Sequence, residues 1–150
     1  MEVIPVIHNV SSVQRVVDMA RLVYSLGYDT LIVTKAYGGA AQSGIPEAMR
    51  IALRENKRLI VLPELSDAVE LLKPDQIFIV TKDYSEEHLD PAKPPRLEGR
   101  ILIAFSGSDP DFSIQEARLG RPIYLKGIEG GRLGPLAEAG IILYALKGRD

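Results

Sequence analysis

The chain has 150 residues, of which 46% are hydrophobic and 25% charged. This composition is typical of one globular domain and excludes a disordered or fibrous protein. The 20 acidic and 18 basic side chains give a formal net charge of −2, which argues against a protein covered in basic charge for nucleic acid and leaves room only for a local basic patch. The absence of cysteine excludes disulfides, thiolate metal sites and a cysteine nucleophile.

The sequence carries no sign of export or membrane insertion. No basic region followed by an apolar stretch and a small-residue cleavage site stands at its start, and no run of about 18 apolar residues occurs. We therefore expect a cytoplasmic protein that does not enter a membrane. Two histidines are too few for a histidine-rich metal centre, so we expect no metal.

Apolar stretches alternate with amphipathic ones along the chain. Uniformly apolar stretches predict strands at residues 3–7, 29–34, 58–62, 76–81, 100–105 and 121–125. Apolar residues that recur at intervals of three and four predict helices at residues 12–26, 45–56, 66–72 and 133–147. Ser11 and Ser12 are candidate N-caps of the first helix, and Gly27 is its expected left-handed end. Buried strands that alternate with helices predict one α/β domain over residues 1–150, with a parallel sheet covered on both faces.

Two connections differ from the rest. Residues 36–43 are small and polar and contain Gly38 and Gly39, so we expect a flexible loop. Residues 83–99 are charged, rich in proline and longer than an ordinary connection. Such a stretch is either a mobile surface loop or a functional segment.

Ligands of an open parallel sheet bind beyond the carboxyl ends of its strands. At that edge the glycine-containing stretches 106–111 and 127–131 each follow a strand and precede a helix. Their exposed backbone amides can bind a phosphate, or the glycines can simply allow the backbone to form turns. Neither stretch matches a P-loop or the Rossmann fingerprint, so turn geometry is the commoner explanation.

Polar side chains at the same edge allow two interpretations each. His8 and Asn9 end the first strand and can bind a ligand, or Asn9 can cap a helix. Asp109, Asp111 and Glu116 can be metal ligands, but we favour Asp109 and Asp111 as caps of a short helix, because a hard cation needs more convergent oxygens.

A nuclease is a further possibility. Pro74-Asp75 before a strand and Lys82 after it faintly echo the Pro-Asp…Asp/Glu-x-Lys pattern of one nuclease superfamily. That chemistry needs a second carboxylate to hold the metal that activates water. Val80 stands where this acid belongs, so the pattern argues against nuclease activity.

Taken in order, the segments resemble the SPOUT superfamily of knotted RNA methyltransferases, in particular its SpoU-like branch. Residues 101–109 look like the family strand that runs into a Gly-Ser-Glu loop, and residues 122–125 look like the strand before the last motif. Residues 132–144 follow the rhythm of the family's Ser-Leu-Asn-Val helix. Nearer the start, Arg21 and Gly27 have the spacing of the family's functional arginine and glycine.

The resemblance implies a C-terminal trefoil knot, a homodimer and S-adenosylmethionine as cofactor, without a metal. It implies an RNA methyltransferase, with ribose 2′-O as one target and tRNA or rRNA as substrate. Arg21 would be the catalytic residue, and Arg15, Arg50 and Arg54 would bind RNA. The implied cofactor residues are Val80, Thr81, Gly107, Ser108, Leu125, Lys126, Gly127, Ile128, Leu133, Gly134 and Leu136.

Four positions depart from the family pattern. Arg132 and Gly134 replace the Ser and Asn of the last motif, Asp109 replaces the Glu of the middle motif, and Arg15 stands where the N-terminal Asn belongs. These losses favour a rival hypothesis, in which a non-catalytic protein of the same fold binds a nucleotide-like ligand or a protein partner.

Overall fold

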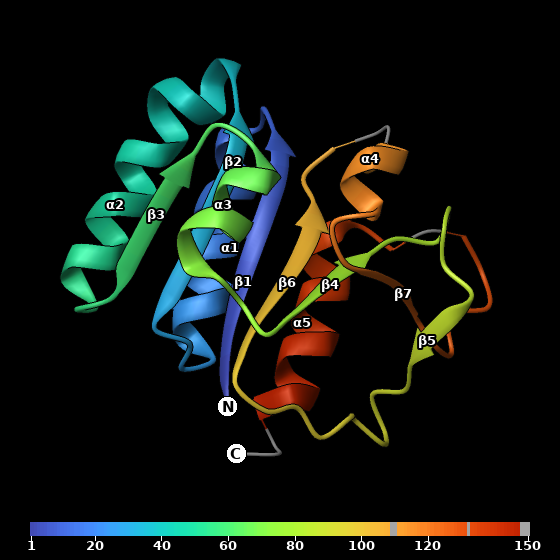
Figure 1. Cartoon of the computed structure of the whole chain (residues 1–150). Coiled ribbons are helices and arrows are strands. Elements are labelled where there is room, and N and C mark those ends of the chain that lie inside the picture. The colour runs from blue at the N-terminus through green and yellow to red at the C-terminus, as the bar shows by residue number, and fades with distance from the viewer. Residues whose placement is uncertain (109–110, 132, 148–150) are drawn as a thin grey trace.

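A computed structural model describes residues 1–108, 111–131 and 133–147 of the chain. It contains a seven-stranded sheet in the order β3-β2-β1-β6-β4-β7-β5, and all six strand pairings are parallel. The strands are β1 (Glu2–Val10), β2 (Thr30–Ala36), β3 (Arg58–Leu62), β4 (Gln76–Val80), β5 (Glu87–Leu89), β6 (Arg100–Ser106) and β7 (Arg121–Leu125). The predicted α/β domain with a parallel sheet is therefore confirmed (Figure 1). The threading of a knot stays a prediction.

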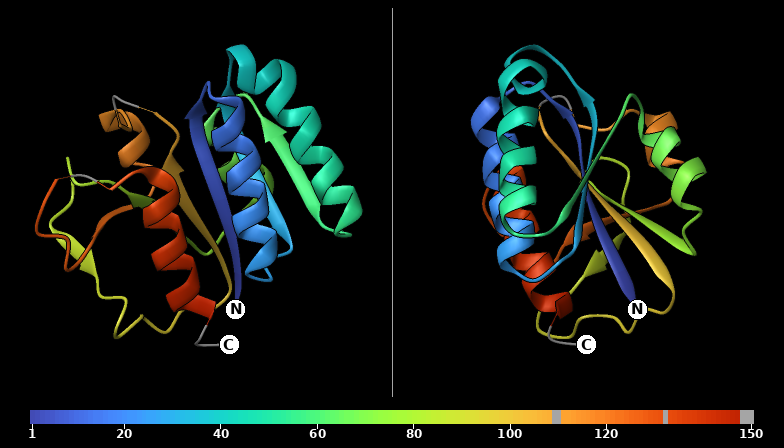
Figure 2. Two further views of the ribbon diagram at one scale, coloured as in Figure 1. Left: turned by 180° about the vertical axis from the view of Figure 1, so that it is seen from behind. Right: turned by 90° about the vertical axis from the view of Figure 1, so that its left-hand side faces the viewer.

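Helices cover both faces of the sheet. They are α1 (Val13–Ser25), the π-helix η1 (Ala40–Gly44), α2 (Ile45–Arg54), α3 (Leu65–Leu72), α4 (Ile114–Ala117) and α5 (Pro135–Lys147). Figure 2 shows α1, α2 and α5 on one face, and α3 and α4 on the other. Two buried apolar clusters correspond to these two layers. Each central strand serves both clusters because its side chains alternate between the faces: in β1, Ile7 joins the first and Val6 the second.

The local signals of the first helix act as expected. The Ser12 hydroxyl accepts a hydrogen bond from the Arg15 amide, and the helix ends before Gly27, whose φ is +93°. Of the two candidate serines, Ser12 is the cap. The apolar side of the helix buries Val16, Ala20 and other residues against the sheet.

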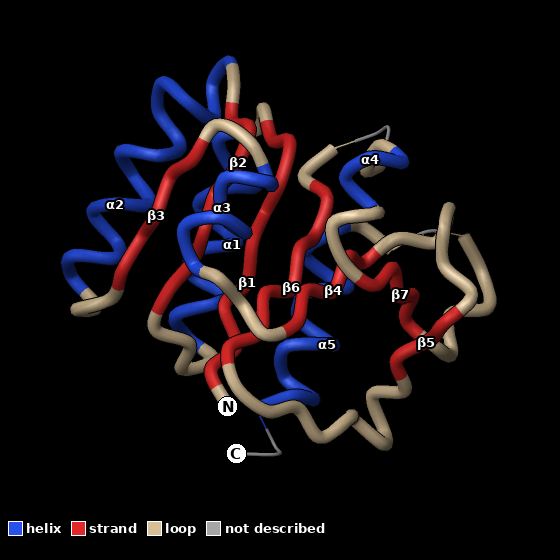
Figure 3. Tube along the Cα trace, viewed as in Figure 1, coloured by secondary structure: helices blue, strands red, loops and turns tan. Residues whose placement is uncertain are grey.

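Two predicted loops contain regular structure. The segment expected to be flexible between β2 and α2 forms η1, because Gly39 and Gly44 pack against Val13 and so bring this backbone onto the start of α1. The stretch 83–99 contains β5, which pairs with β7 at the edge of the sheet. Figure 3 shows β5 flanked on both sides by irregular chain. In the described part of the chain, no helix is long and apolar enough to cross a membrane.

Candidate functional site

A pocket of about 240 Å³ with a mixed polar and apolar lining lies at the carboxyl edge of the sheet, and we call it the strand-end pocket. It is built where β4 and β6 end, beside the first turn of α1 and the start of α5. Strand order reverses here: β2 and β3 continue from β1 to one side, whereas β6 and β4 lie on the other. Ligand sites of parallel sheets form at such switch points. The pocket is lined by Arg15, Val80, Thr81, Lys82, Ser106, Ser108, Asp111, Leu133, Gly134, Pro135 and Glu138.

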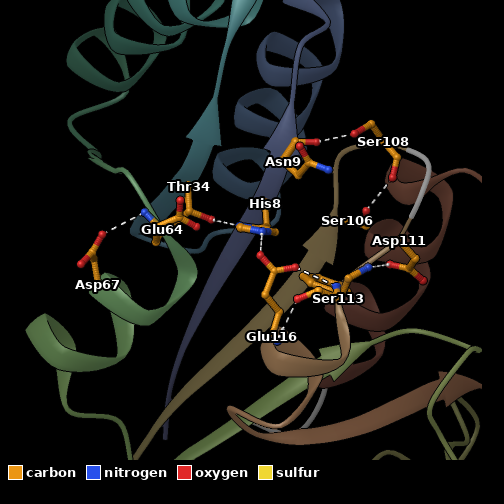
Figure 4. Close-up of polar contacts among 11 residues, drawn as sticks. His8, Asn9, Thr34, Glu64, Asp67, Ser106, Ser108, Asp111, Ser113 and Glu116 are labelled. Carbon is orange, nitrogen blue, oxygen red and sulfur yellow. Dashed lines mark hydrogen bonds and ion pairs between the residues drawn. The ribbon is translucent and has the colours of Figure 1, made fainter.

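The chain after β6 is tied to the end of β1. Gly107 donates its amide hydrogen to the His8 carbonyl at 2.6 Å, and Arg15 donates from Nη1 to the Gly107 carbonyl at 2.5 Å. The Ser108 hydroxyl donates to the Asn9 carbonyl at 2.7 Å (Figure 4). A Cβ at Gly107 would lie 2.6 Å from Val10 Cβ, so only glycine permits this close approach. These bonds fix Arg15 and Ser108 at the pocket.

Asp111 belongs to the pocket and not to a helix cap. Its carboxylate accepts a 2.7 Å hydrogen bond from the Thr81 hydroxyl and so ties the residue after β4 to the segment that precedes α4. The expected cap is therefore wrong for Asp111: Ser113 caps α4, in a capping box that it shares with Glu116. Asp109, the other expected cap, lies outside the described residues.

A buried polar network lies beside the pocket, around His8. The imidazole Nδ1 is 2.7 Å from the Thr34 hydroxyl, and Nε2 is 2.5 Å from Oε2 of Glu116 (Figure 4). Because a carboxylate can only accept, Nε2 carries the proton in the neutral imidazole, and Thr34 donates to Nδ1. Phe112 stacks on the imidazole with a centroid distance of 5.6 Å.

The pKa values of both titratable groups of this network are lowered. Burial lowers the pKa of His8, against the opposing effect of Glu116. Burial alone would raise the pKa of Glu116, but the Ser113 amide and the His8 ring outweigh it and hold that pKa below its ordinary value. At neutral pH the network therefore consists of a neutral imidazole and a carboxylate.

A more open hollow of about 410 Å³, the side pocket, adjoins the strand-end pocket through Lys82, which lines both. Its other lining residues come from the start of stretch 83–99 and from the end of β7. Among them are four of the residues expected to hold the cofactor: Leu125, Lys126, Gly127 and Ile128.

The strand-end pocket brings together several other expected cofactor residues, which are Val80, Thr81, Ser108, Leu133 and Gly134. Gly107 packs behind it against β1, and Leu136 packs against the apolar core. The residues expected to hold one cofactor are thus divided between two adjoining hollows.

The expected catalytic and RNA-binding arginines do not form one site. Arg21 is exposed and pairs with Asp18 on the surface of α1, and it is not among the residues of the strand-end pocket. Arg50 pairs with Glu47 on α2, and Arg54 is exposed on the same helix. Of the expected RNA-binding residues, Arg15 is the one that lines the strand-end pocket.

Sequence reasoning missed two lining residues as ligand contacts, Lys82 and Glu138. Lys82 lies two residues after the end of β4, and its place at a strand end is the signal that could have found it. Ser106 and Asp111 belong to the stretch 106–111 that was already a candidate for ligand binding. Glu138 carries no such signal, because only packing brings the start of α5 to this edge.

The faint nuclease pattern is not assembled. Asp75 precedes β4 and accepts from the Arg100 amide at 2.8 Å, at the amino edge of the sheet. Lys82 follows β4 at the carboxyl edge, so the whole strand separates the two side chains. Among the residues that the structure describes, no three His, Asp or Glu side chains gather in a group able to hold a metal ion.

Comparison with known proteins decides the family. A family profile described as RecB-family nuclease (DUF2122) matches residues 38–145. A candidate type II restriction enzyme of Aeropyrum pernix is 60% identical over 97% of this chain and 93% of its own length. A second, from Methanocaldococcus jannaschii, is 33% identical over 94% of this chain and 93% of its own length. The chain belongs to the DUF2122 family.

Solved structures with the same fold carry different names. The SpoU methyltransferase AviRb from Streptomyces viridochromogenes superposes with a TM-score of 0.75 at 14% identity. The alignment covers 99% of this chain, which spans 60% of AviRb. An AdoMet-bound rRNA methyltransferase from Sinorhizobium meliloti superposes with a TM-score of 0.76 at 10% identity. That alignment covers 98% of this chain and 56% of the methyltransferase. At such identities the likeness establishes a SpoU-like fold alone.

These findings correct the expected activity. The fold resemblance to SpoU methyltransferases is confirmed, but the matching family profile and the two relatives by sequence carry the names of nucleases. The expectation of an S-adenosylmethionine-dependent RNA methyltransferase is therefore wrong, because the matching family and the relatives by sequence are named for nuclease activity. The relatives by sequence and the solved structures named above all carry the names of enzymes, which supports the coarser expectation that this protein is one.

Proposed function

We propose that this protein is an enzyme acting on nucleic acid, and that its strand-end pocket holds an adenosine-bearing cofactor, with S-adenosylmethionine as the first candidate. Nucleic acid is what the two groups of relatives have in common: one is named for nuclease activity and the other for RNA methylation. A structure from the second group is described as AdoMet-bound.

The chemical variety of the pocket carries the proposal. Val80, Leu133 and Pro135 offer an apolar surface, which suits a flat purine ring. The hydroxyl-bearing side chains of Thr81, Ser106 and Ser108 suit a ribose.

The same pocket contains charges of both signs. Arg15 and Lys82 complement a carboxylate, whereas Asp111 and Glu138 complement an ammonium group. A ligand with a purine, a ribose and an amino-acid zwitterion matches this set, which a simple nucleotide would match only in part.

Calorimetry tests this proposal directly. We expect S-adenosylmethionine to bind with a dissociation constant of about micromolar order, and ATP, which has the adenosine but no zwitterion, to bind at least about tenfold more weakly. Leu133→Arg fills the pocket and should abolish binding. Leu71→Arg is the matched control, because Leu71 is 60% exposed on α3. Absence of heat at millimolar S-adenosylmethionine, or binding that survives Leu133→Arg, would overturn the proposal.

Phosphodiester cleavage is the second candidate, favoured by the relative that is 60% identical. Arg15 and Lys82 could hold a phosphate, and Asp111 could act on water as a general base. The assay is nicking of plasmid DNA and of a long RNA, with and without Mg²⁺, by the wild type and by Asp111→Asn. Cleavage lost in Asp111→Asn would favour this candidate over the first, and cleavage equal in both proteins would place it outside the pocket.

A further inference from the structure

We infer that His8 is a positioning residue: with Glu116 it holds residues 111–117, the α4 segment, against the strand ends and so sets one wall of the strand-end pocket. The inference rests on the function proposed for that pocket. His8 itself is 1% exposed, so its role is to act through the segment that it holds.

The α4 segment depends on outside contacts. Its helix has four residues, a single turn, and so short a helix has little stability of its own. The segment nevertheless carries Asp111, which lines the pocket and accepts from Thr81. A contact that anchors the α4 segment therefore also fixes the position of the Asp111 carboxylate in the pocket.

Glu116 joins the helix to the sheet. Its Oε1 accepts from the Ser113 amide at 2.8 Å within the capping box, and its Oε2 meets His8 Nε2 at 2.5 Å. One carboxylate thus closes the helix and attaches it to β1. A hydrogen bond to a charged group is worth more than a neutral one, particularly where water is scarce.

The aromatic contact adds a second point of attachment from the same imidazole. Phe112 is 3% exposed and lies nearly parallel to His8, with an angle of 11° between the rings. Phe112 directly follows Asp111, so a movement of the ring would move the pocket wall. Thr34 on β2 holds the far side of the imidazole and fixes the direction of Nε2 (Figure 4).

The arrangement also predicts the response to acid. The charged groups that act on His8 are Glu116 from α4, Lys35 from β2 and Glu64 at the start of α3. When the α4 segment opens, the pKa of His8 returns from its lowered value towards about 6.5. The open state therefore binds the proton more readily, and opening becomes easier as the pH falls through about 6.5. Glu116 acts in the same direction at lower pH, because its pKa is also lowered in the closed state.

Hydrogen–deuterium exchange of the full chain tests the anchoring without any ligand. We expect His8→Leu, which leaves Thr34 and Glu116 without their partner, to speed opening of the α4 segment about tenfold or more. His8→Gln keeps an amide donor for Glu116 and should restore part of the protection. The matched control is His88→Gln, because His88 is the exposed second histidine. In the wild type, opening of the α4 segment should become more frequent as the pH falls from 7.5 to 5.5. His8→Gln should not show this increase.

Calorimetry with S-adenosylmethionine then links the anchor to the pocket. We expect about tenfold weaker binding for His8→Leu and a smaller loss for His8→Gln. Unchanged exchange in His8→Leu, or an acid response retained in His8→Gln, would overturn the anchoring. Faster exchange with unchanged affinity would overturn the positioning role. If the wild type binds no S-adenosylmethionine, the proposed function fails, and the exchange data still decide whether His8 holds the segment.

Discussion

At the scale of single residues, a close backbone approach shapes the site. Gly107 lies so near β1 that a Cβ would meet the Asn9 carbonyl at 2.8 Å. Asn9 itself has a φ of +63°, in the left-handed region that non-glycine residues rarely occupy. The carbonyls of Gly107 and Asn9 accept from Arg15 and Ser108, so this tight contact also orients two side chains of the strand-end pocket.

Gly107→Ala should therefore destabilise the fold. We expect a loss of about 1–3 kcal/mol in the free energy of unfolding, because the added methyl group meets backbone that cannot move aside. Gly130→Ala is the control, since nothing lies within 4 Å of a Cβ built there. Urea unfolding measures both. Equal stability of the two variants would contradict this prediction, because it would show that β1 can move aside for the methyl group with no loss in the free energy of unfolding.

At the scale of elements, the first turn of α1 connects helix stability to the pocket. Ser12 caps the helix through the amide of Arg15, the residue whose side chain lines the pocket. The sequence offers Ser11 and Ser12 as candidates, and it is the extended backbone of Ser12 that places its hydroxyl over the helix end.

Ser12→Ala should cost about 1 kcal/mol in the free energy of unfolding, because an amide of the first turn loses its acceptor. Ser11→Ala should have little effect, and the two adjacent serines form a matched pair. Thermal or urea unfolding distinguishes them. A larger loss for Ser11→Ala would contradict the assignment of the cap.

At the scale of the whole molecule, one face of α5 remains uncovered. Ile141 and Tyr144 are 39% and 67% exposed, and they line an apolar groove together with Pro91, Ala92 and Pro94. An exposed apolar surface next to a proline-rich segment is a suitable place for a protein contact. The homodimer expected from the resemblance stays a prediction, and this groove is where we test it.

Sedimentation velocity of the full chain should show a dimer. Tyr144→Glu should shift the species to a monomer, because a carboxylate buried in an apolar contact is costly. Leu53→Glu, at a position 74% exposed on α2, should leave the dimer intact. A monomeric wild type, or a dimer that tolerates Tyr144→Glu, would contradict this placement.

The sequence by itself determined the layered α/β architecture, because apolar strands, helical spacing and capping residues are local signals. The strands at 58–62 and 121–125 have the predicted bounds, and most other elements agree within a few residues. The tertiary structure alone decided the pairing of β5 and the bond between His8 and Glu116, 108 positions apart. It also decided which of the expected cofactor residues share the strand-end pocket and which line the side pocket. Such contacts depend on how helices pack across the sheet, and a single sequence records that packing only indirectly. The SpoU-like pattern predicted the fold correctly and the activity wrongly, because a fold fixes where a pocket forms and the side chains within it determine the reaction.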